Sequence, residues 1–225
     1  MGNWGRRFSA PADNQAGYAA YSSNGDALLG LAVDYPENLK KQLLVAVIQH
    51  GIDLEGASRL GMLMTIPDGG HGTHQLSVMA VASALLGNAS YTAYIKTVQG
   101  PEKGHTYLGA NNVALWGQPC AIYGSNFKAI CIDNNYQKGA KDCRDPDGVY
   151  DELNKPNSWG CVIYQTLNSP YYPSQALAMG LLSAVDDYNH IAFFKYTDRW
   201  MLLNGGIKST FAKEIWQKYR STINW

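Results

Sequence analysis

The hydrophobic positions in the first third of the chain follow a helical period. Pro36 and Glu37 open a stretch with apolar residues three or four apart, and proline favours the first turn of a helix. We expect this helix to continue to about Arg59. A breaker, Ile66–Gly72, follows, and a second helix is predicted from Thr73 to Leu86, ended by Gly87. The first pattern consists of Leu39, Leu43, Leu44, Val47, Ile48 and Leu54.

The rest of the chain divides into an irregular middle and a helical end. Residues 99–170 are rich in Gly, Pro, Asn, Asp and Tyr, with short strand-like pieces at Val113–Trp116 and Lys128–Ile132. Residues 1–25 lack any period and are expected to form an extended arm. The remaining pattern predicts one mainly α domain over residues 26–225 with a loop-rich insertion at about 99–170. Its further helices are expected at Tyr91–Val98, Pro173–Leu182, Tyr188–Leu203 and Ile207–Tyr219.

Charge excludes several classes of protein. The 225 residues carry 18 Lys+Arg and 18 Asp+Glu, and only 16% are charged. A nucleic-acid-binding protein needs a basic face to displace counterions from phosphates, so no nucleic-acid partner is expected. No stretch reaches the roughly 18–20 apolar residues of a membrane span, so no membrane partner is expected either. The chain is instead rich in uncharged groups that bond or stack, with 23 Gly, 15 Tyr and 6 Trp.

The four cysteines all lie in the irregular middle of the chain, at Cys120, Cys131, Cys143 and Cys161. No Cys-x-x-Cys pair or neighbouring histidine suggests zinc. One or two disulfides are therefore predicted, with three pairings open, and they imply a secreted or periplasmic protein. No signal peptide follows the basic start, so secretion fits a chain that is part of a longer one.

The most distinctive chemistry in the sequence is a glycine-rich corner with Asp68, His71 and His74. Glycines let the backbone approach a ligand, and histidine transfers protons near neutral pH. The alternative is a capped turn with two hydrogen-bonded histidines. His50 and Asp53 share one helix face nearby and extend the candidate site. No metal ligand set is expected here, because the His-Glu-x-x-His pattern is absent.

An oxygen-rich segment with Asp145, Asp147 and Asp151 has some features of a calcium loop. It lacks the full spacing of such a loop, so a solvated turn is favoured, and calcium is the only cofactor that the sequence leaves open.

Two aromatic groups are candidates for ligand binding. Trp159, Tyr164, Tyr171 and Tyr172 precede a predicted helix, and flat aromatic faces pack against sugar rings at little entropic cost. The second group, around Phe193 and Trp200, has helical spacing and is predicted to be core. The polar residues beside it are expected to contact substrate: Asn189, His190 and Arg199.

Several segments resemble motifs of large secreted bacterial α/α-toroid proteins associated with polysaccharide degradation. The resemblance implies a helical toroid, of which this chain would form a part, and a polysaccharide partner. It covers both helical ends of the chain, in Gln49–Leu54, Gly69–Gly72, Ala84–Gly87, Ser174–Met179 and Tyr188–Met201.

Together these features predict a carbohydrate-active protein, with a polysaccharide lyase as the leading hypothesis. β-Elimination beside a uronic acid needs a base, a group that neutralises the carboxylate and an acid. We assign His71 as base or neutraliser and Tyr172 or Tyr107 as acid, with His50 and His74 among the substrate-binding residues. Hydrolysis by Asp53 and Asp68 is the enzymatic alternative. The non-enzymatic alternative is a glycan-binding or assembly subunit, since low net charge favours self-association.

Overall fold

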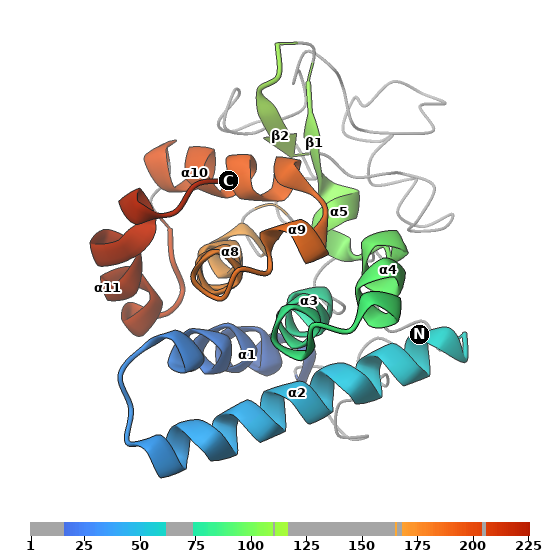
Figure 1. Ribbon diagram of the computed structural model, residues 1–225. Helices are drawn as coiled ribbons and strands as arrows, with labels where there is room; N and C mark the ends of the chain where they lie inside the picture. Colours follow the sequence, from blue (N-terminus) through green and yellow to red (C-terminus); the bar gives the residue numbers. More distant parts are fainter. Residues whose placement is uncertain (1–15, 62–73, 110, 117–164, 166–167, 204–205) are drawn as a thin grey trace.

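The computed structural model describes residues 16–61, 74–109, 111–116, 165, 168–203 and 206–225. This part of the chain is mainly helical, with one small antiparallel sheet (Figure 1). The elements are α1 (Ala16–Ala32), α2 (Glu37–Arg59), α3 (Gln75–Leu86), α4 (Ala89–Thr97), α5 (Pro101–His105), β1 (Thr106–Leu108), β2 (Ala114–Trp116), η2 (Ser169–Tyr171), α8 (Tyr172–Leu181), α9 (Val185–Tyr188), α10 (Ile191–Leu203), α11 (Thr210–Tyr219) and η3 (Arg220–Thr222).

Helix α8 is the central element. Every residue from Tyr172 to Met179 is buried, and α1, α3, α9, α10 and α11 lie around it (Figure 1). A helix that is apolar on all sides is stable only when neighbours cover it completely. Helix α3 is similar, because Gln75 to Ser83 are all buried. These two helices therefore form the interior against which the others pack.

Helix α2 is the long outer helix and packs closely on α3. Gly51 makes the close approach possible, since a Cβ at this position would lie 2.3 Å from the Cβ of Ala82. Val47, Leu54 and Ala57 line the buried face on either side of it. The opposite face of α2 is exposed, as its amphipathic pattern requires.

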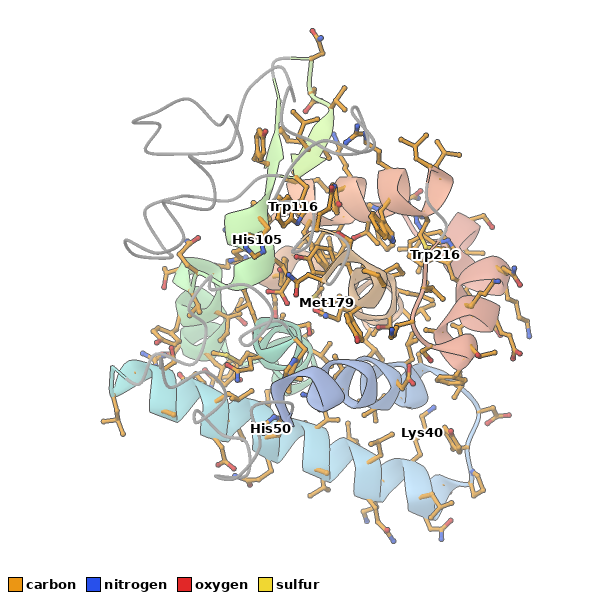
Figure 2. All side chains as sticks on the ribbon, turned by 180° about the vertical axis from the view of Figure 1, so that it is seen from behind. Lys40, His50, His105, Trp116, Met179 and Trp216 are labelled. Carbon is orange, nitrogen blue, oxygen red and sulfur yellow. The ribbon has the colours of Figure 1, made fainter. Side chains whose placement is uncertain are left out.

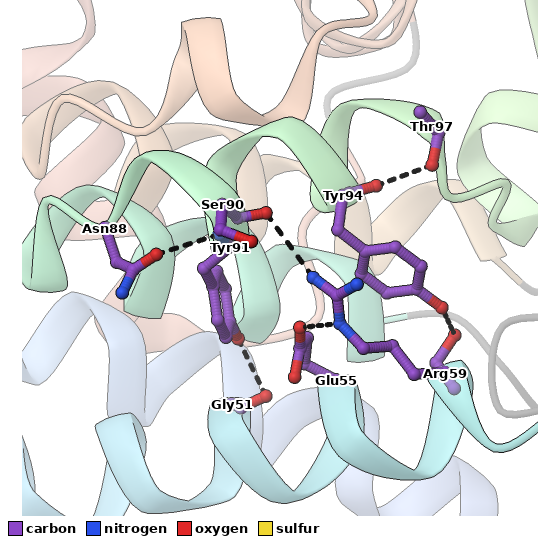
Figure 3. Close-up of polar contacts among 9 residues, drawn as sticks. Gly51, Glu55, Arg59, Asn88, Ser90, Tyr91, Tyr94 and Thr97 are labelled. Carbon is purple, nitrogen blue, oxygen red and sulfur yellow. Dashed lines mark hydrogen bonds and ion pairs between the residues drawn. The ribbon is translucent and has the colours of Figure 1, made fainter.

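Helix α4 is tied to α2 by polar contacts (Figure 3). The hydroxyl of Tyr91 donates to the carbonyl oxygen of Gly51 (2.7 Å), and the hydroxyl of Tyr94 donates to Oγ of Ser58 (2.8 Å). The guanidinium of Arg59 lies 4.1 Å from the centre of the Tyr94 ring. At the start of α4, the side chain of Asn88 caps the helix by accepting the backbone N–H of Tyr91.

The C-terminal segment closes over α10 and α8. Arg220 forms an ion pair with Asp198 of α10, and its guanidinium lies 3.7 Å from the centre of the Trp225 ring. The indole N–H of Trp225 also donates to Asp198 (2.9 Å). Gly180 of α8 leaves room for this segment, because a Cβ there would lie 2.7–2.8 Å from Ile223 and Trp225.

The β1–β2 hairpin stands against α10 and pairs Thr106 with Trp116, Tyr107 with Leu115 and Leu108 with Ala114. Arg199 of α10 donates to the carbonyl oxygen of Ala114 (3.1 Å), so this residue has a structural contact. The ring of Trp116 stacks on His105 with 5.1 Å between ring centres, and Figure 2 shows this pair apart from His50 on α2.

The predicted helical pattern is confirmed for α2, α3, α4, α8, α10 and α11, and the predicted end of α3 is confirmed by Gly87 at φ 61°. The expected helix from Tyr188 begins instead at Ile191, because Asn189 adopts a left-handed conformation that ends α9. Residues 16–25, expected in an extended arm, belong to α1, whose alanines favour a helix. The predicted strand Lys128–Ile132 and all four cysteines lie outside the described residues.

A pair of glycine substitutions tests the α2–α3 packing. Gly51→Ala should lower the free energy of unfolding by about 1–3 kcal/mol, because the added methyl group forces the helices apart. Gly56→Ala is the matched control on the same helix, since nothing lies within 4 Å of its Cβ position. It should raise stability by about 0.5–1 kcal/mol through helix propensity. Urea unfolding of both variants checks the pair, and equal effects would contradict the packing.

Candidate functional site

An open pocket of about 680 Å³ lies between the β1 side of the hairpin and the α9–α10 junction. Its size falls in the range of small-molecule sites, about 300–1,000 Å³. Segments far apart in the sequence meet there. Its walls are Lys96, Lys103, Thr106, Tyr107, Leu108, Val185, Asp186, Asn189, His190, Ile191 and Ala192.

His190 is held in this pocket by Thr106, which is 84 positions away in the sequence. Its Nε2 lies 2.8 Å from the carbonyl oxygen of Thr106 and 3.0 Å from the hydroxyl oxygen. The Thr106 hydroxyl donates to the carbonyl oxygen of Glu102 (2.6 Å), so both Thr106 oxygens act as acceptors toward the ring. Nε2 therefore carries the proton, and in the neutral ring Nδ1 carries the lone pair that can accept one.

The backbone between α9 and α10 explains the position of His190. Asn189 has φ 54°, and asparagine tolerates this left-handed conformation better than most residues. The turn ends α9 and starts α10 two residues later, which leaves Asn189 exposed and His190 half-buried at the rim. Tyr107 of β1 is also half-buried in the pocket wall.

Two lysines give the pocket its positive charge. Lys103 is buried, and its Nζ donates to the carbonyl oxygens of Val98 (2.9 Å) and Lys96 (3.5 Å). Burial lowers its pKa to about 8, and the nearby Glu102 opposes this effect, so the ammonium group stays mostly protonated at neutral pH. Lys96 is exposed in the last turn of α4. Asp186 is the acidic residue among the lining groups.

A buried carboxyl group lies behind the pocket. Glu102 is fully buried, and its Oε1 accepts the backbone N–H of His74 (2.6 Å). Within the described part of the chain, its Oε2 has no hydrogen-bond partner. Burial raises the pKa of Glu102 to about 7, against the opposing effects of the backbone amides of His74 and Glu102 and of the Lys103 charge. The hydroxyl of Tyr188, from α9, is buried near it, and its pKa is raised mainly by burial and further by Glu102.

His74 begins α3 with φ 83°, in the left-handed region. The side chain is buried, and burial lowers its pKa to about 3, with a further contribution from His50. The ring is therefore neutral at physiological pH. Its backbone N–H, rather than its ring, makes the contact with Glu102.

The other predicted site residues are dispersed. Tyr172 is completely buried against Phe193 and Tyr196, with ring centres 5.1 and 6.1 Å away. Tyr171 is half-buried in η2. His50 and Asp53 lie on α2, where Asp53 accepts a hydrogen bond from Gln49 (2.8 Å). Several candidates lie outside the described residues: Asp68, His71, Trp159, Tyr164 and the calcium candidates Asp145, Asp147 and Asp151.

The structure therefore brings together three sequence candidates, Tyr107, Asn189 and His190, and adds residues that pattern reasoning missed. Lys96 and Lys103 are the most important additions. The sequence feature that could have pointed to Lys103 is the stretch Gly100-Pro101-Glu102-Lys103. Its proline favours the start of a helix, and two adjacent residues of opposite charge follow in a chain with few charges.

No three His, Cys, Asp or Glu side chains gather as a metal site within the described part of the chain. None of the helices described there combines the length and hydropathy needed to cross a bilayer. Comparison with known proteins gives no match to a family model, a curated protein or a solved structure.

The buried carboxyl group predicts a specific pH dependence. Glu102 ionises at 4.5 in the unfolded chain and at about 7 in the folded one, so its contribution to stability is complete below pH 4.5 and is lost as the pH rises to about 7. The loss is about 3 kcal/mol, at 1.36 kcal/mol per pKa unit. Glu102→Gln keeps an acceptor for His74 and removes this titration. The variant should therefore gain stability relative to wild type as the pH rises through this interval.

Urea unfolding of both proteins at several pH values between 4.5 and 7 measures the difference. Taking the difference cancels the opposing effect of His74, whose depressed pKa makes stability rise with pH between about 3 and 6.5. Glu214→Gln, at an exposed site on α11, is the control for removal of a carboxyl group outside the core. A flat difference for Glu102→Gln would contradict the raised pKa.

Proposed function

We propose that the pocket binds a uronate unit of a polysaccharide and that the protein is a polysaccharide lyase. The observation that carries the proposal is the convergence of His190, Tyr107 and Asn189 with two lysines in one open pocket. These groups match the three needs of β-elimination: a base, an acid and a site for the sugar carboxylate.

Lys96 and Asn189 are the groups best placed to bind the carboxylate. Both are exposed in the pocket wall, and both can donate, Lys96 through its ammonium group and Asn189 through its amide N–H₂. Lys103 adds the positive charge of a buried ammonium group that donates to the Val98 carbonyl oxygen. Binding at these groups withdraws electron density from the carboxylate and makes the neighbouring C5 proton more acidic.

His190 is the proposed base and Tyr107 the proposed acid. Nδ1 of His190 takes the C5 proton while Nε2–H stays bonded to Thr106. The electron pair of the C5–H bond forms the C4=C5 double bond, and the C4–O bond breaks. The hydroxyl of Tyr107 gives its proton to the leaving oxygen. The base then carries one extra proton and the acid one fewer, and exchange with solvent restores both.

We further propose that the chain forms part of an α/α toroid and that the protein is secreted or periplasmic and contains disulfides. A mainly helical chain is compatible with an α/α toroid, and a polymeric substrate fits a secreted or periplasmic protein with disulfides. The glycan-binding subunit is the competing function, and it would use the same pocket without chemistry.

Substitution of the proposed base separates the two functions. His190→Ala should lower the rate of unsaturated-product formation by about 10²–10⁴-fold, the range for loss of a general base, while polymer affinity changes little. Tyr107→Phe should lower the rate similarly. The measurement is the ultraviolet absorbance of unsaturated products from a panel of uronate polymers, with affinity measured by calorimetry.

Lys213→Ala, at an exposed position on α11 outside the pocket walls, is the control and should keep wild-type turnover. If the wild-type protein binds a uronate polymer but releases no unsaturated product, the chain is a binding subunit. If it binds none, the pocket is not a uronate site.

A further inference from the structure

A second open pocket, of about 530 Å³, lies beside the first and shares Lys96 with it. It is bounded by the C-terminal end of α3, by α4, by Ser183 before α9 and by Asp187 within α9. A ligand that fills the first pocket and extends past Lys96 therefore enters the second. The shared residue makes the two pockets consecutive parts of one path along the surface.

The face of α4 explains this continuity. Ala89, Thr92, Ala93 and Lys96 are spaced three, four and seven residues apart, so they share one face of the helix. Tyr91 and Tyr94 point toward α2 and hold the helix through Gly51 and Ser58 (Figure 3). Apart from Lys96, the side chains on the face toward the pockets are small, and they leave the space open.

The chemistry of the second pocket differs from that of the first. Its polar groups include the hydroxyls of Ser83 and Thr92, 2.8 Å apart, and that of Ser183. Asp187 supplies a negative charge, and Lys96 at the junction is the cation among its lining residues. A second carboxylate bound here would face Asp187, and like charges at short range repel. Hydroxyl groups with methyl-sized apolar neighbours suit an uncharged sugar ring.

We infer that the second pocket is a subsite for a neutral or N-acetylated sugar, so that the ligand is a copolymer in which such sugars alternate with uronates. The inference rests on the proposed function of the first pocket and extends it. Lys96 lies between the two subsites and binds the uronate carboxylate at the junction. A polymer made of uronates alone places a carboxylate in each pocket, and the carboxylate in the second pocket is repelled by Asp187.

Affinity measured against ligand length tests this subsite. The probes are hyaluronan and chondroitin oligosaccharides, which alternate, and oligogalacturonates and oligomannuronates, which are uronate throughout. The wild-type protein should bind an alternating tetrasaccharide about tenfold more tightly than the disaccharide, a step of about 1.4 kcal/mol. The homopolymers should show no such gain. Calorimetry provides the affinities.

Ala93→Trp fills the second pocket and should remove the gain with length while leaving disaccharide affinity unchanged. Ala46→Trp, at an exposed position on α2, is the matched control and should keep the gain. Asp187→Asn should strengthen binding of the oligogalacturonate tetrasaccharide by removing the repulsion.

The outcomes separate the two proposals. Two results would overturn the second subsite alone, provided that the protein binds the disaccharide. One is an equal gain in affinity from disaccharide to tetrasaccharide for alternating and homopolymeric ligands. The other is an unchanged gain in Ala93→Trp. No binding of any uronate oligosaccharide overturns both the second subsite and the function proposed for the first pocket.

Discussion

The hydrogen bond from the backbone N–H of His74 to the buried carboxyl group of Glu102 links the core to the candidate site. It fixes the left-handed start of α3, one of the two fully buried helices, against the short helix α5. The chain passes from α5 into β1, and the backbone oxygens of Glu102 and Thr106 then orient His190. The rim of the pocket therefore depends on a contact made in the interior.

This contact places two titratable groups in the core, and burial moves their pKa values toward the neutral forms in opposite directions. The pKa of His74 falls to about 3 and that of Glu102 rises to about 7. Near neutral pH the charge behind the pocket is therefore set by Glu102 and by the neighbouring Lys103, whose pKa is about 8. Oε2 of Glu102 has no hydrogen-bond partner among the described residues, and a buried polar atom left unpaired in this way costs stability.

Much of the fold could be predicted from the sequence, because its long helices carry local signals. Pro36 at the start of α2 and Gly87 at the end of α3 are residues whose backbone preferences match those positions. The short α5 and β1 escaped prediction, since five and three residues cannot establish a period. The helix boundary at Asn189 was also missed, because the left-handed turn interrupts a continuous apolar pattern.

The candidate site was less predictable because it is built from tertiary contacts. The sequence indicated His190 as a candidate because it lies beside a group of aromatic residues. Its hydrogen-bond partner Thr106 lies 84 positions earlier, in a segment without a clear hydrophobic pattern. Lys96 belongs to α4, whose most distinctive residues in the sequence are the tyrosines Tyr91 and Tyr94. Those tyrosines face α2 and therefore do not point to the pocket. The division of α4 into an anchored face and a small-residue face follows from helical geometry, but only the packing shows which face is open. A helix held so firmly on one side gives both pockets a wall that is ordered before any ligand binds.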